Sequence, residues 1–493
     1  MSLRERMGDL LINSGWKNET ARQLASWDPY DQNASSPFFD SEWMFGISNG
    51  FDIVIGNPPY VDSETMTRNN VEFRDILKSK YGTAKGNWDL FVIFIERGLG
   101  LASSIGSLSF IVPNKLISAK YTQDLRQFLS KKSIIELIDY SAVDVFAEVD
   151  VYPIVFLITN NTKIRSDVKT KVMSSLGEAK TENIIKNELF HRDIFWDKYF
   201  FDKPILDLVI KISDNTPLGK IFPEILGSAT VSEAYEIKEH LQELNKQKNH
   251  LKFINTGTID PYLSHWGQHK TQYIKSSYLE PIISEEDLRS INSKRLQQSK
   301  SAKIIISGMA LRIEAFYDRG EYCAGKSTSI IIGDKENLKA ITGILNSKVI
   351  SFWFSKYFNS LSMAGGYFNI GPNELGQIPI SKNLKLPLFA MSTLVEYMIC
   401  LRDSSDNKFS FFESLIDAIT YELYLNTMIK ARNCEVIKHL NNLPKLDDAW
   451  AIEKRLSLVD KLFNELSNPK HLVARAMAMM QEIEEVKIIE GRK

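Results

Sequence analysis

The chain lacks the features that mark a secreted or membrane-embedded protein. It contains only three cysteines, which are odd in number and far apart in the sequence. This usage argues for reduced thiols and against a disulfide framework or a zinc cluster. The first residues contain no apolar core of signal-peptide length, and the apolar region 90–112 is interrupted by Glu96 and Arg97, so it is not a membrane span. We therefore expect a cytoplasmic protein that has no membrane partner.

An excess of charge of either sign is also missing. The chain of 493 residues has a formal net charge of −1, and 44% of its residues are apolar and 25% charged. These fractions are ordinary for a globular protein, and the length predicts two to four domains. Because the overall charge gives no support to nucleic-acid binding, any surface that contacts nucleic acid must be locally basic.

The most informative stretch is residues 51–60, which read Phe-Asp-Ile-Val-Ile-Gly-Asn-Pro-Pro-Tyr. An apolar run of strand length ends at Gly56, and two prolines then fix two φ angles and remove two N–H donors. Open α/β sheets place their ligands at the C-terminal ends of their strands. The amide oxygen of Asn57 and the carbonyl of Pro58 can each accept a hydrogen from an exocyclic amine, while the ring of Tyr60 stacks on the same base. A strand-to-helix loop that merely contains two prolines is the alternative.

Downstream of this loop the pattern alternates between helix and strand, which predicts an open α/β sheet. The expected elements are helices over residues 88–102 and 120–129 and strands over residues 107–112, 134–140 and 151–158. Residues 1–26 predict short amphipathic helices. The polar residues 62–85 predict a mobile lid or a substrate-contacting loop, with an ordinary surface connection as the alternative.

These motifs together resemble the TaqI-type adenine-specific DNA methyltransferases and the larger type IIG restriction–modification fusions. The matching segments are Asn-Pro-Pro-Tyr at 57–60, Asn-Trp-Asp-Leu-Phe at 87–91, Ser-Phe-Ile-Val-Pro at 109–113, Val-Phe at 145–146 and Tyr-Pro-Ile-Val-Phe at 152–156. The resemblance covers nearly all of the chain. It implies methyl transfer from S-adenosylmethionine to the exocyclic amine of an adenine flipped out of duplex DNA, with Asn57, Pro58 and Tyr60 as the catalytic residues. It also implies that Phe146 packs on the base opposite Tyr60, and a plain core aromatic is the alternative.

One feature of this family has no counterpart in the sequence. Before Phe51 there is no Gly-x-Gly and there are too few residues for three βα units, while Gly98 and Gly100 fall at the end of an expected helix. A cofactor-binding loop needs a strand before it and a helix after it. We therefore expect a partial Rossmann-like methyltransferase sheet with an incomplete S-adenosylmethionine site, in which Asn57 lies next to the donor methyl. Either the protein is truncated, or a complementary N-terminal chain or self-association completes the site.

The remainder of the chain predicts a recognition domain and a helical end. The expected divisions are lead-in helices and a loop at 1–50, the catalytic half at 51–165, a bridge at 166–216, an α+β DNA target-recognition domain at 217–383 and a helical C-terminal region at 384–493. Strand-like runs occur at 253–259, 303–307, 313–317 and 328–332, and a helix is expected at 343–357. Apolar residues at helical spacing predict helices over 388–402, 411–425, 447–466 and 470–486.

A locally basic, aromatic-rich region falls within the expected recognition domain. Residues 245–326 contain 13 Lys and Arg against 8 Asp and Glu, a balance that suits a DNA backbone. We assign DNA contacts to Tyr262, Trp266, Arg312, Lys326 and Ser327. A solvated surface on a neutral protein is the alternative.

Two further patterns in this region are misleading. Residues 320–327 fit the phosphate-loop pattern Gly-x4-Gly-Lys-Ser, but the β-branched run that follows favours a strand where that loop needs a helix. His265 and His269 have a metal-like spacing without a third ligand close by, so no metal is expected. Two rival functions remain: a non-catalytic DNA-recognition subunit, and a protein-glutamine methyltransferase. The second is disfavoured because those enzymes are short after the motif, whereas more than 400 residues follow it in this sequence.

Overall fold

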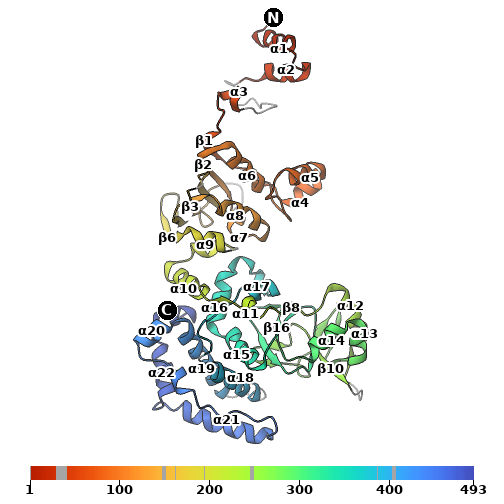
Figure 1. Ribbon diagram of the computed structural model, residues 1–493, viewed down its shortest axis with the longest axis vertical. Coiled ribbons are helices and arrows are strands. Elements are labelled where there is room, and N and C mark those ends of the chain that lie inside the picture. Colours follow the sequence, from red (N-terminus) through yellow and green to blue (C-terminus); the bar gives the residue numbers. More distant parts are fainter. Residues whose placement is uncertain are drawn as a thin grey trace. The chain divides into compact units, whose positions relative to one another are not determined.

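The computed structural model describes residues 2–28, 41–146, 152–161, 163–193, 195–244, 249–385, 387–401 and 407–492. The chain forms two compact units, Met1–Trp196 and Asp197–Lys493, and Figure 1 labels many of their elements.

The first unit is a mixed sheet with helices. Its elements are α1 (Leu3–Asn13), α2 (Asn18–Ser26), α3 (Ser41–Phe45), β1 (Phe51–Gly56), α4 (Ser63–Asn69), α5 (Val71–Lys80), α6 (Phe91–Leu101), β2 (Ala102–Pro113), α7 (Lys115–Ser118), α8 (Gln123–Ser130), β3 (Ser133–Asp139), β4 (Pro153–Thr159), β5 (Asp167–Met173), β6 (Ala179–Lys186) and α9 (Asn187–Arg192). The six strands follow the order β1-β2-β4-β3-β5-β6. This arrangement confirms the expected α/β class.

Four of the six strands run in the same direction. β1 is parallel to β2, β3 is parallel to β5, and β4 is antiparallel to both β2 and β3. β6 closes the order as an antiparallel partner of β5. The C-terminal ends of β1, β2 and β3 therefore lie at the same edge of the sheet, and the loops that leave them are neighbours.

Helix α6 covers one face of this sheet at close range. Its side chains of Phe91, Ile95 and Leu99 are buried. A Cβ atom added at Gly98 would lie 2.8 Å from the Leu108 side chain and 3.0 Å from that of Phe110. Gly98 therefore lets the helix approach β2, which is a packing role and not a cofactor-loop role.

Residues 63–80 form two capped helices, which corrects the expectation of a loop over 62–85. Asp62 and Asn70 cap α4 and α5 by accepting the N–H groups of Thr65 and Phe73. Behind these helices, the N–H and hydroxyl groups of Thr83 both donate to the Glu96 carboxylate of α6, at 3.0 and 2.5 Å. Local capping residues outweighed the low apolar content from which the loop was inferred.

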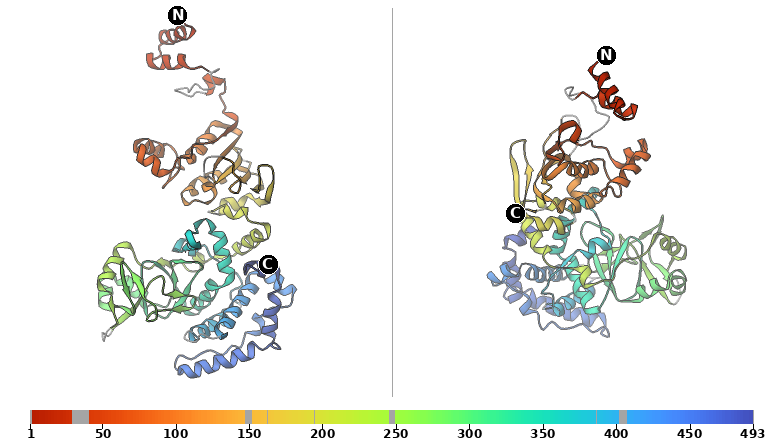
Figure 2. Two further views of the ribbon diagram at one scale, coloured as in Figure 1. Left: turned by 180° about the vertical axis from the view of Figure 1, so that it is seen from behind. Right: turned by 45° about the horizontal axis from the view of Figure 1, so that its top comes forward.

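The expected bridge at 166–216 is also revised, because its first part belongs to the sheet. β5 and β6 form a hairpin that extends the sheet beyond β3, and the boundary between the units falls after Trp196. The hairpin is the pair of long yellow strands in the right view of Figure 2. Its strands alternate polar and apolar residues, which is typical of an edge that water reaches from one side.

The second unit begins with a strand-rich part. Its elements are α10 (Lys203–Ser213), β7 (Thr216–Pro217), α11 (Leu218–Ile221), β8 (Ile225–Gly227), α12 (Val231–His240), β9 (Gln242–Glu243), β10 (His250–Ile254), β11 (Ile259–Asp260), β12 (Leu263–Ser264), β13 (Thr271–Tyr273), β14 (Ser276–Tyr278), β15 (Pro281–Ser284), α13 (Glu285–Ile291), α14 (Ser293–Lys300), β16 (Lys303–Ser307), β17 (Met309–Ala310), β18 (Ala315–Asp318), β19 (Tyr322–Ala324) and β20 (Thr328–Ile332). Two four-stranded sheets organise it, β18-β16-β20-β8 and β19-β10-β15-β9.

The strands at 303–307 and 328–332 occur with the expected bounds, because their β-branched runs are buried, except for the half-buried Ile332 at the end of the second strand. β20 follows directly on Ser327, which confirms that residues 320–327 do not open a helix as a phosphate loop does. The turn before it is organised by Asp318, whose carboxylate accepts the N–H groups of Gly320 and Glu321 at 3.0 and 2.9 Å. Asp318 also forms a fully buried ion pair with Lys303.

Helices make up the rest of the second unit. They are α15 (Lys335–Asn346), α16 (Lys348–Tyr357), α17 (Pro372–Gly376), α18 (Leu388–Cys400), α19 (Asn407–Tyr424), α20 (Asn426–Ala431), α21 (Ile452–Leu466), α22 (Leu472–Met480) and α23 (Glu484–Ile489), with the short strands β21 (Phe368–Asn369) and β22 (Pro379–Ile380) between α16 and α18.

Helices occur in all four expected C-terminal ranges, but the helix expected at 447–466 begins at Ile452, and the one expected at 470–486 is two helices, α22 and α23. The single helix expected at 343–357 is two helices, because Ser347 ends α15 and caps α16. α15 lies between the strand-rich part and the helical part, in contact with β18 and with α18. Within the described residues, no helix is long and apolar enough to cross a membrane.

Candidate functional site

The Asn-Pro-Pro-Tyr loop leaves the C-terminal end of β1 and is held at its far end. Asn57 is exposed and Pro58 is buried. The carbonyl of Val61 accepts the Leu90 N–H at 2.9 Å, which ties the loop to the start of α6. One residue further on, Asp62 accepts the N–H of Thr65 at 2.7 Å, and that hydrogen bond lowers the pKa of Asp62. The loop is therefore fixed between a strand and two helices, with the Asn57 side chain facing solvent.

The structure brings Tyr60 and Phe146 together. Their ring centroids lie 6.3 Å apart with an angle of 87° between the ring planes, an edge-to-face contact. The Tyr60 hydroxyl is buried without a hydrogen-bond partner among the described residues. This burial raises the pKa of Tyr60. Phe146 is half-buried and belongs to the loop after β3.

A polar network holds the loop that carries Phe146. The Asn114 side-chain amide donates to the Ser141 hydroxyl at 3.2 Å, and the Ser141 backbone N–H donates to the Asp139 carboxylate at 2.8 Å. The Asn114 backbone N–H donates to the carbonyl of Tyr152 at 2.7 Å, just before β4. The loops after β2 and β3 are thereby fixed next to the loop after β1.

A second polar cluster lies behind the Asn57–Tyr60 loop. The sequence did not predict it, and the only signal there was the presence of Asp89 in the segment 87–91. The buried carboxylate of Asp89 accepts from the Tyr121 hydroxyl at 2.6 Å and from the Lys115 amine at 3.2 Å. Burial and the hydrogen bond to Asp89 raise the pKa of Tyr121 well above its ordinary value. Asp89 directly precedes Leu90, so this cluster positions the anchor of the Asn57 loop.

The described residues form one side of a site and leave the other side open. β1 lies at the end of the strand order, and Ile53 and Ile55 are 70% and 80% exposed. On the opposite face, Val54 and Gly56 pair with Leu108 and Phe110 beneath α6. Among the described residues, no strand with a glycine-rich loop lies beside β1. Within the described residues, the Asn57 loop, Tyr60 and Phe146 therefore lie at one edge of the sheet, beside a face of β1 that is left uncovered.

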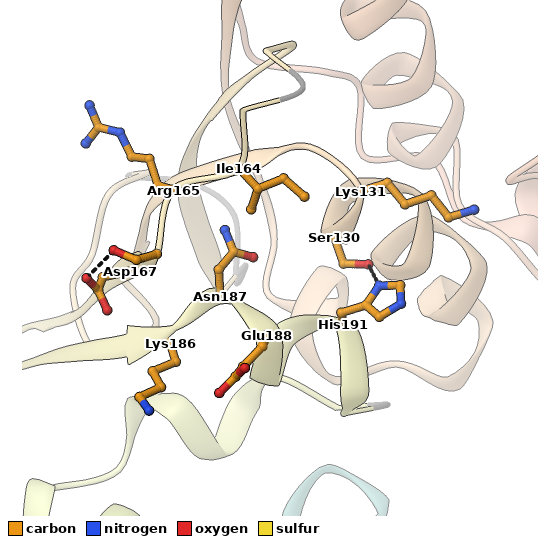
Figure 3. Close-up of a pocket in the computed structure, with 10 residues that line it drawn as sticks. Ser130, Lys131, Ile164, Arg165, Asp167, Lys186, Asn187, Glu188 and His191 are labelled. Carbon is orange, nitrogen blue, oxygen red and sulfur yellow. Dashed lines mark hydrogen bonds between the residues drawn. The ribbon is translucent and has the colours of Figure 1, made fainter.

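A cavity of about 670 Å³ lies at the other end of the same sheet. It is lined by residues from the end of α8, the start of β5, the end of β6 and the start of α9. Figure 3 shows the Asn187 side chain pointing into it, the Ser130 hydroxyl paired with His191 at 3.2 Å, and the charged ends of Lys131 and Arg165 pointing away. This cavity is separate from the Asn57 loop.

Of the residues expected to contact DNA, Tyr262 is buried and Trp266 is half-buried. Tyr262 is only 2% exposed, and its ring packs edge-to-face on Phe409. This corrects the expectation that it faces DNA, because a ring that is already covered by the protein core cannot meet another surface. Trp266 is half-buried and donates its ring N–H to the Pro281 carbonyl at 2.8 Å.

Lys326, Ser327 and Arg312 are all exposed, and hydrogen bonds join their surroundings. The Asn255 side chain donates to the Gln272 carbonyl at 3.1 Å and accepts the Ser327 N–H at 3.2 Å. The Ser327 carbonyl accepts the Gly308 N–H at 2.9 Å, and the Gly308 carbonyl accepts the Ile370 N–H at 2.9 Å. We call the segments joined in this way, 270–278, 307–312, 325–327 and 362–370, the rim.

Two family models match separate parts of the chain. Residues 5–146 match the Eco57I restriction-modification methylase, and residues 242–380 match the TaqI-like C-terminal specificity domain. The first match ends at Phe146, and the second contains most of the rim's supporting strands.

Curated relatives align over parts of their length. The type II restriction enzyme and methyltransferase RM.Eco57I of Escherichia coli is 26% identical over 207 residues, which are 41% of this chain and 20% of the relative. RM.MjaORFECS2P of Methanocaldococcus jannaschii is 24% identical over 88% of this chain and 36% of the relative. The type II methyltransferase M.XhoI of Xanthomonas vasicola is 22% identical over 70% of this chain and 71% of the relative. The chain thus spans about a third or less of the first two relatives.

The chain therefore carries an Eco57I restriction-modification methylase segment followed by a TaqI-like C-terminal specificity domain, and its relatives are type II restriction–modification methyltransferases.

Proposed function

We propose that this chain takes part in site-specific methylation of the exocyclic amine of adenine in duplex DNA, within a restriction–modification system. The observation that carries the proposal is the meeting of the Asn57–Tyr60 loop and Phe146 at one edge of the sheet. A base inside a duplex cannot reach an exposed loop of this kind, so the target adenine is flipped out of the stack.

The acceptor chemistry follows from the groups at the loop. The amine of adenine is a weak nucleophile because its lone pair is delocalised into the ring. The Asn57 amide oxygen and the Pro58 carbonyl accept one amine hydrogen each, which favours a tetrahedral nitrogen and stabilises the positive charge that develops on it. The nitrogen loses its proton only after the new bond has formed, so no strong general base is required.

The donor that this family implies is S-adenosylmethionine, which supplies an electrophilic methyl group. The exposed edge of β1 and the exposed side chains of Ile53 and Ile55 support a further proposal for this side of the site. An apolar edge strand with free N–H and C=O groups tends to recruit another strand. We infer that a complementary methyltransferase chain pairs with β1 and brings the cofactor cradle to Asn57; self-association is the alternative.

A second candidate function is a DNA-recognition subunit without catalysis of its own. The same open edge of β1 favours it, because a specificity domain can read DNA without a cofactor site. The two candidates differ in whether Asn57 acts on the substrate.

Deletion of the gene from its own organism separates these functions. We expect N6-methyladenine to disappear from one sequence motif of the genome, as mapped by single-molecule sequencing. Restoring the gene should restore the mark, and restoring Asn57→Ala should not. Full restoration by Asn57→Ala would instead establish the recognition subunit, and an unchanged methylation pattern after deletion would overturn both candidates.

A further inference from the structure

Four large apolar side chains are exposed together on the rim of the second unit. Met309, Leu311, Met363 and Tyr367 are 49%, 55%, 41% and 44% exposed. They come from two segments that pair as the ribbon β17·β21, in which Met309 faces Asn369 and Ala310 faces Phe368. Single exposed apolar residues are ordinary, whereas a group of them on one ribbon marks an interaction surface.

The ribbon is preformed. Met363 donates its N–H to the Tyr367 carbonyl at 2.8 Å, and Gly366 donates back to Met363 at 2.9 Å. Gly365 and Gly366 have φ values of +84° and +81°, a conformation that other residues rarely adopt. A Cβ added at Gly366 would lie 3.6 Å from the Leu311 side chain, so the two segments are in contact.

Positive charges flank these apolar side chains. Lys326 lies next to Ser327, whose carbonyl bonds Gly308 at the base of the ribbon. Lys275 is exposed at the tip of the β13·β14 hairpin, which Asn255 links to Ser327. Arg312 follows Leu311 and is 43% exposed, at 3.8 Å from Glu413. Phosphates on both sides of an apolar insertion would be complementary to this pattern of charge.

We propose that Met309, Leu311, Met363 and Tyr367 form an apolar wedge that enters a groove of DNA and opens one base step, while Lys275 and Lys326 contact the flanking phosphates. The inference rests on the proposed function and names the part of the specificity domain that acts on the bases. Proteins that insert apolar side chains between base pairs unstack the step and bend the duplex, and the bend lets more protein surface contact DNA. The rim supplies the three parts that this mode requires: a rigid support, an apolar tip and cations beside it.

The test uses the full chain and a pool of duplexes with a randomised central region. Sequences that the wild-type chain retains are recovered and labelled at both ends with a donor and an acceptor dye. The wedge variant is Met309→Ser with Leu311→Ser and Tyr367→Ser, and the ionic variant is Lys275→Ala with Lys326→Ala. Met479→Ser is the matched control, because Met479 lies on α22 and is 45% exposed.

We expect the wild-type chain to bend the recovered duplexes and the wedge variant to leave them straight. The wedge variant should bind about tenfold more weakly with an unchanged dependence of log K on log salt concentration, since apolar contacts release no counterions. The ionic variant should keep the bend and lose about one unit of that slope per lysine. Met479→Ser should match the wild type in all three measurements.

Three results would overturn the inference, and they are distinguishable. If the wild-type chain retains no duplex at low salt, it does not recognise DNA, and the proposed function is wrong as well. If the wedge variant retains, selects and bends DNA like the wild type, the wedge proposal is wrong and the proposed function is unaffected. The third result combines a wild type that binds without bending the duplex with a wedge variant that binds more weakly. It would assign the four side chains to groove contacts, such as contacts with thymine methyl groups, and would overturn the opened base step.

Discussion

The rings of Tyr60 and Phe146 meet edge to face, with centroids 6.3 Å apart and planes at 87°. A base held between two parallel rings needs a separation of about 7 Å, which is twice the contact distance between carbon atoms. The distance between the Tyr60 and Phe146 rings is thus close to that of two rings with a base between them, but the rings are perpendicular and not parallel. If a base enters between them, as the proposed function requires, one ring has to turn by nearly a right angle.

The first prediction concerns Asn57. In an enzyme reconstituted with the complementary chain, we expect Asn57→Ala to lower methyl transfer by about 100–1,000-fold, as the loss of one preorganised transition-state contact does in other enzymes. DNA binding measured by fluorescence anisotropy should be unchanged, because Asn57 acts on the amine and not on phosphates. Asn87→Ala, another exposed asparagine of the same unit, is the control. Activity of Asn57→Ala within a few-fold of the wild type would remove Asn57 from the mechanism.

Stacking is tested at Tyr60 and Phe146 with an adenine analogue that fluoresces when unstacked. Alanine at either position should reduce the brightening on binding, since stacking on one ring contributes about 1–3 kcal/mol per base. Tyr60→Phe should behave like the wild type, because the Tyr60 hydroxyl has no partner among the described residues. An unchanged signal for Phe146→Ala would return that residue to a packing role.

The open edge of β1 predicts how the isolated chain behaves. Calorimetry should detect negligible binding of S-adenosylmethionine, and sizing should detect self-association that disappears in Ile53→Lys with Ile55→Lys, because charges on an edge strand oppose pairing. Ile184→Lys is the control, since Ile184 is 71% exposed on β6 at the opposite edge of the sheet. Micromolar cofactor binding by a monomer would contradict the inferred need for a complementary chain.

At the tip of the β13·β14 hairpin, we expect one substitution to increase stability and to weaken DNA binding. Ile274 and Lys275 have φ values of +40° and +63°, which glycine adopts without strain. Lys275→Gly should therefore raise the free energy of unfolding by about 1 kcal/mol, measured by denaturant titration. The same variant should bind DNA more weakly because a phosphate contact is lost. A variant that is less stable than the wild type would show that the lysine conformation carries no strain.

Asp417 predicts how stability depends on pH. Its carboxylate accepts the Lys348 N–H at 2.8 Å, yet burial raises its pKa to about 7, and the charges of Glu413 and Glu490 act in the same direction. Between its ordinary value of 3.8 and about 7 the folded state binds a proton that the unfolded state has lost, so this group's contribution to stability falls as pH rises through that window. As pH rises through this window, the melting temperature of Asp417→Asn should therefore increase relative to that of the wild type. If the difference in melting temperature between the variant and the wild type stays constant, Asp417 does not bind a proton in this pH range.

Several local features could be read from the sequence because near neighbours in the chain decide them. The strand 51–56 and the loop after it, the strands 303–307 and 328–332, and the rejection of the phosphate-loop pattern all depend on β-branched runs and prolines. Capping residues would also have revealed α4 and α5, since Asp62 and Asn70 cap them. Their polar composition was instead interpreted as a loop.

The sequence by itself determined which groups follow β1, while the tertiary structure decided which distant groups meet them. Phe146 reaches Tyr60 because β4 returns between β2 and β3 and leaves the three loops at one edge. The same dependence explains the error at Tyr262: an aromatic ring suits a DNA surface and a core equally well, and in the fold Phe409 of the distant helix α19 packs against it. Burial is a property of what lies over a residue, and in a folded chain those atoms come mostly from elsewhere in the sequence.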